Sequence, residues 1–309
     1  MSSREWREVK LGDICNVTSS KRIFAREYLK SGVPFYRGKE IIEKHKDKII
    51  STELFISDER YKEIKKAYGV PEAGDILLTS VGTLGIPYIV RNEKFYFKDG
   101  NLTWIKDYNK NLNNKFLYYW LISPLGKSEI MHKTIGSTQQ ALTIQAINSF
   151  LVSLPPHFEQ QAIADTLSCL DDMIELNNRT NQILEEIAQT IFKQWFVDFE
   201  FPNEDGQPFK SSGGEMVDSE LGEIPNGWRV NEIGEIADVI DCLHSKKPTR
   251  SSTGPILLQL NNIRDDGLLD ISDVFMISDD DYKKWISRVE ATKGDCVITN
   301  VGRVGAVSQ

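Results

Sequence analysis

Cysteine and histidine are scarce in this sequence of 309 residues, with four of each. The cysteines form no Cys-x-x-Cys pair, which argues against a disulfide framework and against a structural zinc site. The histidines show no metal-ligand spacing. The residues concerned are Cys15, Cys169, Cys242, Cys296, His45, His132, His157 and His244. We therefore expect no metal on this chain.

Long apolar segments and nucleotide-binding motifs are also lacking. No apolar run approaches the roughly 20 residues of a membrane-spanning helix, and the N-terminus shows no hydrophobic secretion signal. There is no Gly-x-x-x-x-Gly-Lys-Ser/Thr loop and no Gly-x-Gly-x-x-Gly turn. Leu154–His157 is similar to the proline motif of amino-methyltransferases, but it lacks the leading polar and the trailing aromatic residue. We expect a cytoplasmic protein with no membrane segment and no cofactor or catalytic residue of its own.

The charge is distributed unevenly along the chain. The formal net charge is −8, which on its own argues against a uniformly basic nucleic-acid binder. Residues 1–157, however, contain 24 Lys and Arg against 17 Asp and Glu, a net charge of +7. Residues 158–309 contain 13 against 28, a net charge of −15. The first part therefore has the charge that favours DNA, and the second part favours a protein partner.

An internal repeat divides the chain. Residues 6–12 (WREVKLG) are echoed by residues 228–234 (WRVNEIG), and later matches keep almost the same offset. Residues 57–62 match 278–283, and residues 74–85 match 294–305. An ordered series of matches predicts a duplicated domain. The second copy stops about 69 residues short of the length of the first; a naturally shortened chain and a piece of a longer one are both compatible with this.

Each repeat unit has the pattern of a mixed, strand-rich domain. Apolar runs at 74–79, 86–90 and 102–105 predict strands. Residues 57–67, with Ser57 as cap, and residues 115–131 predict helices. The fold class we expect is α+β. The expected boundaries are 1–157 for the first domain, 158–200 for a central helix, 201–227 for a linker and 228–309 for the partial second domain.

The central segment 158–199 contains neither glycine nor proline over 42 residues. As one helix it would be about 60 Å long. Apolar residues follow a spacing of three and four, interrupted in the middle by Asn177 and Asn181. This pattern predicts a coiled-coil-like helix with a partner along its stripe; the alternative is a helix packed wholly on its own domains. The residues expected to bind partners are Ile163, Leu167, Leu170, Ile174, Leu184, Ile187, Phe192, Trp195, Phe196 and Phe199.

Three segments carry a resemblance to a known family. Pro155–Ala164 (PPHFEQQAIA) and Leu184–Phe199 are similar to the start and end of the central conserved helix in specificity subunits of type I restriction–modification systems. Leu221–Trp228 (LGEIPNGW) resembles the entry into a second target-recognition domain. The resemblance covers essentially the whole chain and implies a non-catalytic subunit with two recognition domains, each of which reads half of a bipartite DNA site.

The resemblance also implies partners and contact residues. The partners are double-stranded DNA, methyltransferase subunits that use S-adenosylmethionine, and a motor–nuclease subunit that uses ATP and Mg; a second copy could also pair through the central helix. Four polar loops of the first domain resemble DNA-facing segments, and their candidate residues are Ser19, Ser20, Lys21, Arg22, Arg37, Lys39, Ser80, Thr83, Ser137, Thr138, Gln139 and Gln140. The alternative is an interaction protein that binds such subunits without reading DNA.

Overall fold

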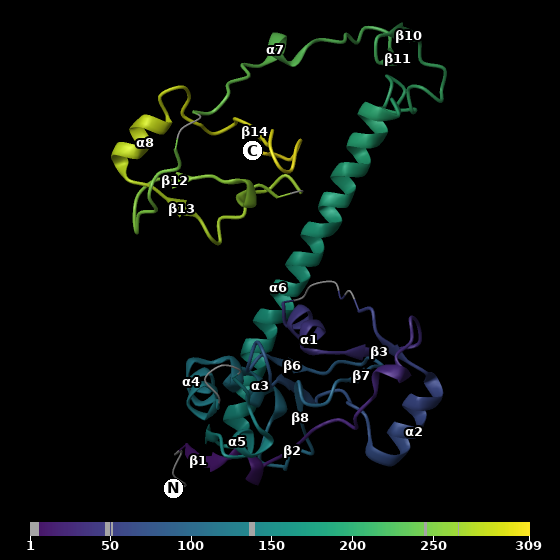
Figure 1. Ribbon diagram of the computed structural model, residues 1–309. Coiled ribbons are helices and arrows are strands. Elements are labelled where there is room, and N and C mark those ends of the chain that lie inside the picture. The colour runs from purple at the N-terminus through teal and green to yellow at the C-terminus, as the bar shows by residue number, and fades with distance from the viewer. Residues whose placement is uncertain (1–5, 47–49, 51, 136–139, 244–245, 265) are drawn as a thin grey trace. The chain divides into compact units, whose positions relative to one another are not determined.

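The computed structural model describes residues 6–46, 50, 52–135, 140–243, 246–264 and 266–309 (Figure 1). The chain forms two compact units, Met1–Thr190 and Ile191–Gln309. Most of the central helix belongs to the first of these units.

In the described part of the first unit, two small sheets and one strand pair form the β-structure. The antiparallel four-stranded sheet has the order β2 (Asn16–Thr18), β8 (Leu102–Lys106), β5 (Ile76–Thr79), β6 (Pro87–Ile89). The three-stranded sheet has the order β4 (Phe55–Ile56), β3 (Val33–Tyr36), β7 (Tyr96–Phe97). β1 (Arg7–Lys10) pairs antiparallel with β9 (Leu151–Leu154), so the two ends of the domain are tied together. The expected strands β5, β6 and β8 and the α+β class are confirmed.

The helices of this domain are α1 (Gly38–His45), α2 (Asp58–Tyr68), α3 (Asn114–Ile122), α4 (Pro124–Lys133) and α5 (Ile144–Asn148). The expected cap of α2 is confirmed, because Ser57 Oγ accepts a hydrogen bond from the Arg60 amide at 3.1 Å. The expected single helix over 115–131 is wrong. Pro124 has no amide hydrogen and starts a new helix, and Ser123 Oγ caps it by accepting from the Gly126 amide at 3.2 Å.

The core lies on both faces of the four-stranded sheet, since successive side chains of a strand point to opposite sides. All four residues of β5 are buried. Ile76 and Leu78 pack with Trp120 of α3, whereas Leu77 packs with Trp104 of β8 on the other face. Because β5 is buried on both faces of the four-stranded sheet, the turn that follows it, Ser80–Gly85, starts from a rigid strand.

The long helix α6 (His157–Phe192) begins on the domain through a buried amide. Gln160 is fully buried; its Nε2 donates to the carbonyls of Asn111 and Pro155, both at 2.8 Å, and its Oε1 accepts from the Asn113 amide at 2.9 Å. Every polar atom of this side chain therefore has a partner, and the start of the helix is fixed to the loop before α3.

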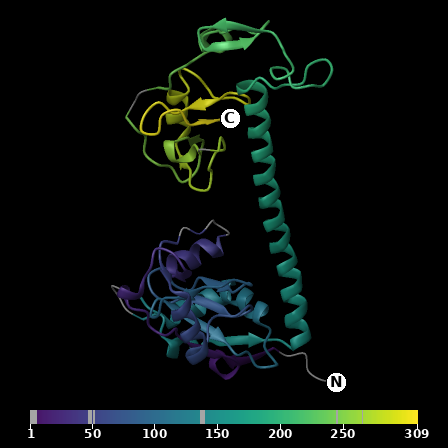
Figure 2. The same cartoon turned by 90° about the vertical axis from the view of Figure 1, so that its right-hand side faces the viewer.

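Beyond this anchor, α6 leaves the domain surface (Figure 2). Tyr119 Oη donates to Asp171 at 2.7 Å, and the Arg91 guanidinium forms two contacts of 3.1 Å with the Glu175 carboxylate. The residues from Asp171 to Phe192 are exposed. The expected helix over 158–199 is thus confirmed for most of its length, with a last π-helical turn over Lys193–Val197.

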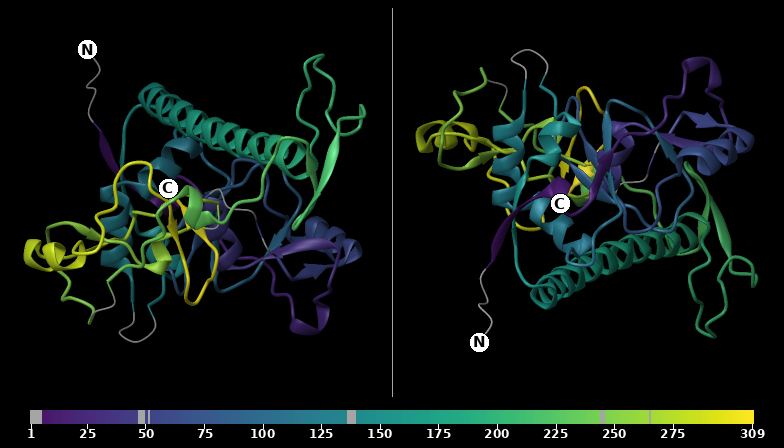
Figure 3. Two further views of the ribbon diagram at one scale, coloured as in Figure 1. Left: turned by 90° about the horizontal axis from the view of Figure 1, so that it is seen from above. Right: turned by 90° about the horizontal axis from the view of Figure 1, so that it is seen from below.

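The second unit contains short pairs of strands. The β10 (Met216–Ser219) and β11 (Gly222–Pro225) strands form a separate ribbon (Figure 3). Two further antiparallel pairs are β12 (Ile256–Leu257) with β13 (Phe275–Met276), and β14 (Val297–Ile298) with β15 (Val307–Ser308). The helices are α7 (Ile233–Ile236) and α8 (Asp279–Trp285).

The predicted repeat has a detailed structural counterpart. The β5–β6 pair aligns Leu77 with Tyr88, and β14–β15 aligns Val297 with Ser308, the equivalent positions at an offset of 220. Gly32 and Gly254 both have positive φ, at 132° and 124°, and a Cβ atom there would lie 2.5 Å from the Ile56 carbonyl oxygen and 2.2 Å from that of Ile277, respectively. The shared strand register and the two equivalent positions that require glycine support a common architecture for the two units.

Candidate nucleic-acid interface

A pocket of about 560 Å³ lies at the N-terminal end of α1. It is lined by Arg37, Lys39, Val81, Thr83 and Asn101, among others. Three residues that the sequence predicts as DNA contacts, from two loops separated by more than 40 positions, therefore share one hollow. We call this hollow the Arg37 pocket.

Arg37 is held in place by a buried carboxylate. Glu40 is fully buried, and its two oxygens accept hydrogen bonds from the Arg37 amide at 2.8 Å and from the Arg37 guanidinium at 2.7 Å. Burial raises the pKa of Glu40, but the hydrogen bonds and charge of Arg37 outweigh it, and the pKa of Glu40 is lowered. The side chain of Arg37 is 31% exposed, so part of the guanidinium still faces the solvent with its direction fixed.

The opposite wall of the pocket is the turn after β5. Thr79 Oγ1 accepts from the Ile86 amide at 2.9 Å, and the Gly85 amide donates to the Thr79 carbonyl at 2.8 Å. Thr83 is exposed at the tip. Ser80, in contrast, is buried, and its hydroxyl lies 2.6 Å from that of Thr103. Ser80 therefore stabilises the base of the turn, and we leave it out of the proposed contact set.

A third predicted loop reaches the same end of the domain. Ala141 forms β-bridges with Ile135 and with Val81, and the Leu142 amide donates to the Ser80 carbonyl at 2.9 Å. Gln140, immediately before this bridge, is exposed. Ser137, Thr138 and Gln139 lie outside the described residues.

The fourth predicted loop connects to this region through the turn after β7. The Lys21 amide donates to Tyr96 Oη at 2.7 Å, and Arg22 Nε lies 2.8 Å from an oxygen of Asp99. Lys21 and Arg22 are exposed, whereas Ser19 and Ser20 are half-buried. Asn101, two residues after Asp99, lines the Arg37 pocket. The sequence did not single out Asn101, although its position after an Asp-Gly turn signal is typical of a loop side chain.

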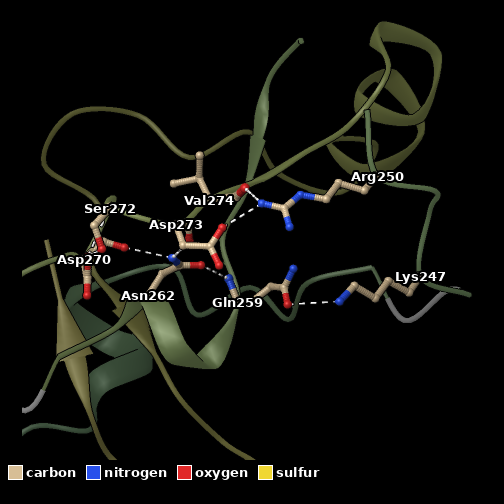
Figure 4. Close-up of polar contacts among 8 residues, drawn as sticks. All are labelled: Lys247, Arg250, Gln259, Asn262, Asp270, Ser272, Asp273 and Val274. Carbon is tan, nitrogen blue, oxygen red and sulfur yellow. Dashed lines mark hydrogen bonds and ion pairs between the residues drawn. The ribbon is translucent and has the colours of Figure 1, made fainter. Parts of the chain in front are cut away.

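The second unit repeats the frame of the Arg37 pocket with different side chains. At the repeat offset Gln259 stands for Arg37 and Asn262 for Glu40. Asn262 is buried, and its Oδ1 accepts from the Gln259 amide at 3.0 Å, as Glu40 does from Arg37. The Gln259 side chain accepts from Lys247 Nζ at 3.0 Å (Figure 4). An uncharged amide pair thus replaces the ion pair.

The same cluster is closed by main-chain contacts around Asn262 (Figure 4). Asn262 Nδ2 donates to the carbonyls of Asp270 and Asp273, at 2.8 and 3.0 Å. Arg250 donates to the Asp273 carboxylate at 2.7 Å and to the Val274 carbonyl at 2.8 Å. The loop that carries Gln259 is therefore braced from both sides.

The predicted partner-binding residues fall into two groups. Ile163 packs against the core of the first unit, and is thereby covered by its own domain. In the second unit, the rings of Phe196 and Phe199 lie 6.0 and 5.5 Å from that of Trp228, so a residue of the same chain covers part of these two rings, although Phe196 is still 49% exposed. The others are exposed by 37–60% of their surface and carry the stripe: Leu167, Leu170, Ile174, Leu184, Ile187, Phe192 and Trp195.

Within the described part of the chain, no three His, Cys, Asp or Glu side chains are grouped so that they could hold a metal ion. None of the helices formed by the described residues has the length and apolar character needed to cross a bilayer.

Comparison with known proteins identifies the class. Residues 3–186 match the family model of the type I restriction modification DNA specificity domain. Because the match covers more than half of the sequence, the chain belongs to this family. The resemblance seen in the central helix is confirmed.

Several relatives are specificity subunits. The chain is 30% identical over 240 residues to the type I restriction enzyme MjaIX specificity subunit of Methanocaldococcus jannaschii, covering 76% of this chain and 52% of the relative. It is 31% identical over 185 residues to the putative specificity subunit S.HindORF215P of Haemophilus influenzae, covering 59% and 43%. The chain thus spans about half the length of the curated relatives that it matches.

Solved structures of similar proteins include the type I restriction–modification S subunit from M. genitalium. The similarity has a TM-score of 0.48 at 13% identity and covers 100% of this chain and 70% of that one. The HsdS subunit from Thermoanaerobacter tengcongensis gives a TM-score of 0.42 at 20% identity and covers 58% and 41%.

Proposed function

We propose that this chain is the sequence-specific DNA-recognition and scaffold subunit of a cytoplasmic type I restriction–modification complex. It directs methyltransferase and motor–nuclease subunits to a bipartite double-stranded site. S-adenosylmethionine, ATP and Mg bind to those partner subunits, and catalysis takes place there. This chain supplies DNA contacts and a helical platform.

The observation that carries the proposal is the Arg37 pocket. Arg37, Lys39, Thr83 and Gln140 come from three loops and gather at one end of a rigid domain in a family of DNA specificity domains. Arg and Lys form paired contacts with guanine edges, and Gln and Thr contact bases or phosphates. Because Glu40 orients Arg37 before DNA arrives, little conformational entropy is lost on binding.

The second unit supports a bipartite site with two unlike halves. Gln259 occupies the position of Arg37, and Arg303 that of Thr83 at the repeat offset. An amide contacts adenine where a guanidinium contacts guanine. The two units would therefore prefer different bases within the same frame.

The exposed stripe of α6 is the proposed platform for protein partners. A row of apolar side chains in water favours a partner that covers it. The stripe is self-complementary about position 179: in an antiparallel pair Asn177 would face Asn181, and Ile174 would face Leu184 of a second copy. Methyltransferase subunits and a second copy are thus both candidate partners, and light scattering of the chain with and without methyltransferase subunit measures the copy number.

The proposal is tested by selecting duplexes from a random pool with the purified chain and methyltransferase subunit. Enrichment of a defined motif is the expected result. Lys21→Ala with Arg22→Ala is expected to weaken binding to the selected duplex and to make its dependence on salt less steep. Salt-sensitive binding without any enriched motif would instead identify an interaction protein that does not read DNA.

A further inference from the structure

A second pocket, of about 450 Å³, lies on the first unit at the other end of α1. Its walls come from the end of α1, from the segment after β6, and from α6. We call it the Arg179 pocket, after the cation that α6 contributes. Its polar lining includes Lys44, Lys46, Arg91, Glu175, Arg179 and Gln182.

The Arg179 pocket is strongly cationic. Among the residues that the structure describes, four cationic side chains and one carboxylate, that of Glu175, line it. The carboxylate is bound by Arg91 through two contacts of 3.1 Å, so that its charge is already compensated. Lys44 is paired with Glu93. Lys46 and Arg179 have no ion pair or side-chain hydrogen bond with any residue that the structure describes, and both are exposed.

The wall formed by α6 is polar along one face. Glu175, Asn178, Arg179 and Gln182 follow a spacing of three and four, which places them on the side of the helix that faces the domain. Amide and guanidinium groups are donors that bind phosphate oxygens. The wall therefore differs from the apolar stripe of Leu167 and Ile174, which suits a protein helix.

The position of the pocket favours DNA over an acidic protein segment. Lys39 lies in the first turn of α1 at the Arg37 pocket, and Lys46 directly follows the last residue of α1 at the Arg179 pocket. Seven helical residues span about 10 Å, and this corresponds to roughly three base steps of a duplex at about 3.4 Å each. A duplex whose bases reach the Arg37 pocket would thus pass its backbone close to Lys46 and Arg179.

We infer that the Arg179 pocket binds a DNA backbone phosphate next to the half-site that the first unit reads. Lys46 and Arg179 neutralise the phosphate; Gln182 lines the same pocket, and its Nε2 already donates one hydrogen bond to Glu186 at 3.2 Å. The contact is independent of base sequence and adds affinity without specificity. It rests on the proposed function, because it needs DNA at the Arg37 pocket.

The test compares the full-length chain with the variant Lys46→Ala/Arg179→Ala by fluorescence anisotropy. Two labelled duplexes are used, one with the selected motif and one of scrambled sequence, between 50 and 200 mM salt. Loss of this one phosphate contact makes the slope of log affinity against log salt less steep by about 1. The advantage of the wild type therefore shrinks about three- to fourfold over this range, by the same factor for both duplexes.

The matched control is Lys65→Ala/Lys66→Ala, which removes the same charge from exposed positions near the end of α2. This control is expected to leave the slope unchanged. The single variant Arg179→Lys, which keeps the positive charge, is expected to retain most of the wild-type affinity. An unchanged slope for Lys46→Ala/Arg179→Ala overturns the phosphate site while motif selection keeps the proposed function. Loss of methyltransferase binding with normal DNA affinity would assign the pocket to a protein partner. If the wild type selects no motif and binds neither duplex, both proposals fail.

Discussion

The ion pair of Arg37 and Glu40 allows a prediction in which a second substitution cancels the destabilisation caused by the first. Arg37→Ala leaves the Glu40 carboxylate fully buried without its cation. Removing one partner of a buried pair costs about 3–5 kcal/mol. Because a third of the Arg37 side chain reaches water, we expect a cost below this range, about 2–3 kcal/mol. For a unit of this size the melting temperature would fall by roughly 5–10 °C.

The double variant Arg37→Ala/Glu40→Gln should be more stable than the single one. Glutamine keeps an acceptor for the amide of residue 37 and carries no charge, so we expect a stability within about 1 kcal/mol of the wild type. Lys39→Ala is the control, since it removes a cation from the same helix at a contact of 3.7 Å with Glu43 and should cost less than about 0.5 kcal/mol.

The effect of pH checks the same reasoning. In the wild type folding lowers the pKa of Glu40, so its contribution to stability is present at neutral pH and is lost as the pH falls below about 4. In Arg37→Ala, burial without the cation raises the pKa of Glu40, and the destabilisation disappears as the pH falls and the group is protonated. Thermal unfolding at pH 7 and pH 4, with hydrogen exchange of the α1 amides, measures both. A double variant no more stable than Arg37→Ala would refute the account.

Three further predictions concern other parts of the chain. Gln160→Leu removes three hydrogen bonds and leaves buried carbonyls unpaired. Urea unfolding should therefore show a free energy of unfolding of the first unit that is lower by about 2–4 kcal/mol. A decrease of less than about 1 kcal/mol would show that Gln160 does not fix the start of α6. Burial raises the pKa of Cys15 to about 12, so iodoacetamide at pH 8 should label three cysteines in the native chain and four after denaturation, as counted by mass spectrometry. Trp195→Ala should weaken co-purification with the methyltransferase subunit while the melting of the first unit stays unchanged; full co-purification would remove Trp195 from the platform.

Local signals of the sequence were sufficient for much of the fold. Ser57 caps α2 because a hydroxyl before acidic residues satisfies a free amide within the same turn. The long helix was visible from the absence of glycine and proline in residues 158–199. The break between α3 and α4 was missed, although Pro124 signals it, because the apolar spacing continues through the proline.

The site was predictable only in part, because it depends on contacts between distant residues. Lys39 and Thr83 were expected as surface side chains and line one pocket. The burial of Ser80 follows from its pairing with Thr103 on β8, which no local pattern encodes. Gln160 and Asn101 have their roles because the fold brings them next to loops that are distant in the sequence.

In both units a buried side chain, Glu40 or Asn262, accepts a hydrogen bond from the amide of the residue three positions earlier, Arg37 or Gln259. This dependence constrains the order in which mutations can change the recognition loop. A first mutation of the arginine would create a buried, unpaired carboxylate and would be selected against. A first mutation of the glutamate leaves a cation that can turn toward water, and the arginine can then be replaced at little further cost. Substitutions at this corner should therefore be epistatic and ordered, with the buried residue changing before the base-reading one.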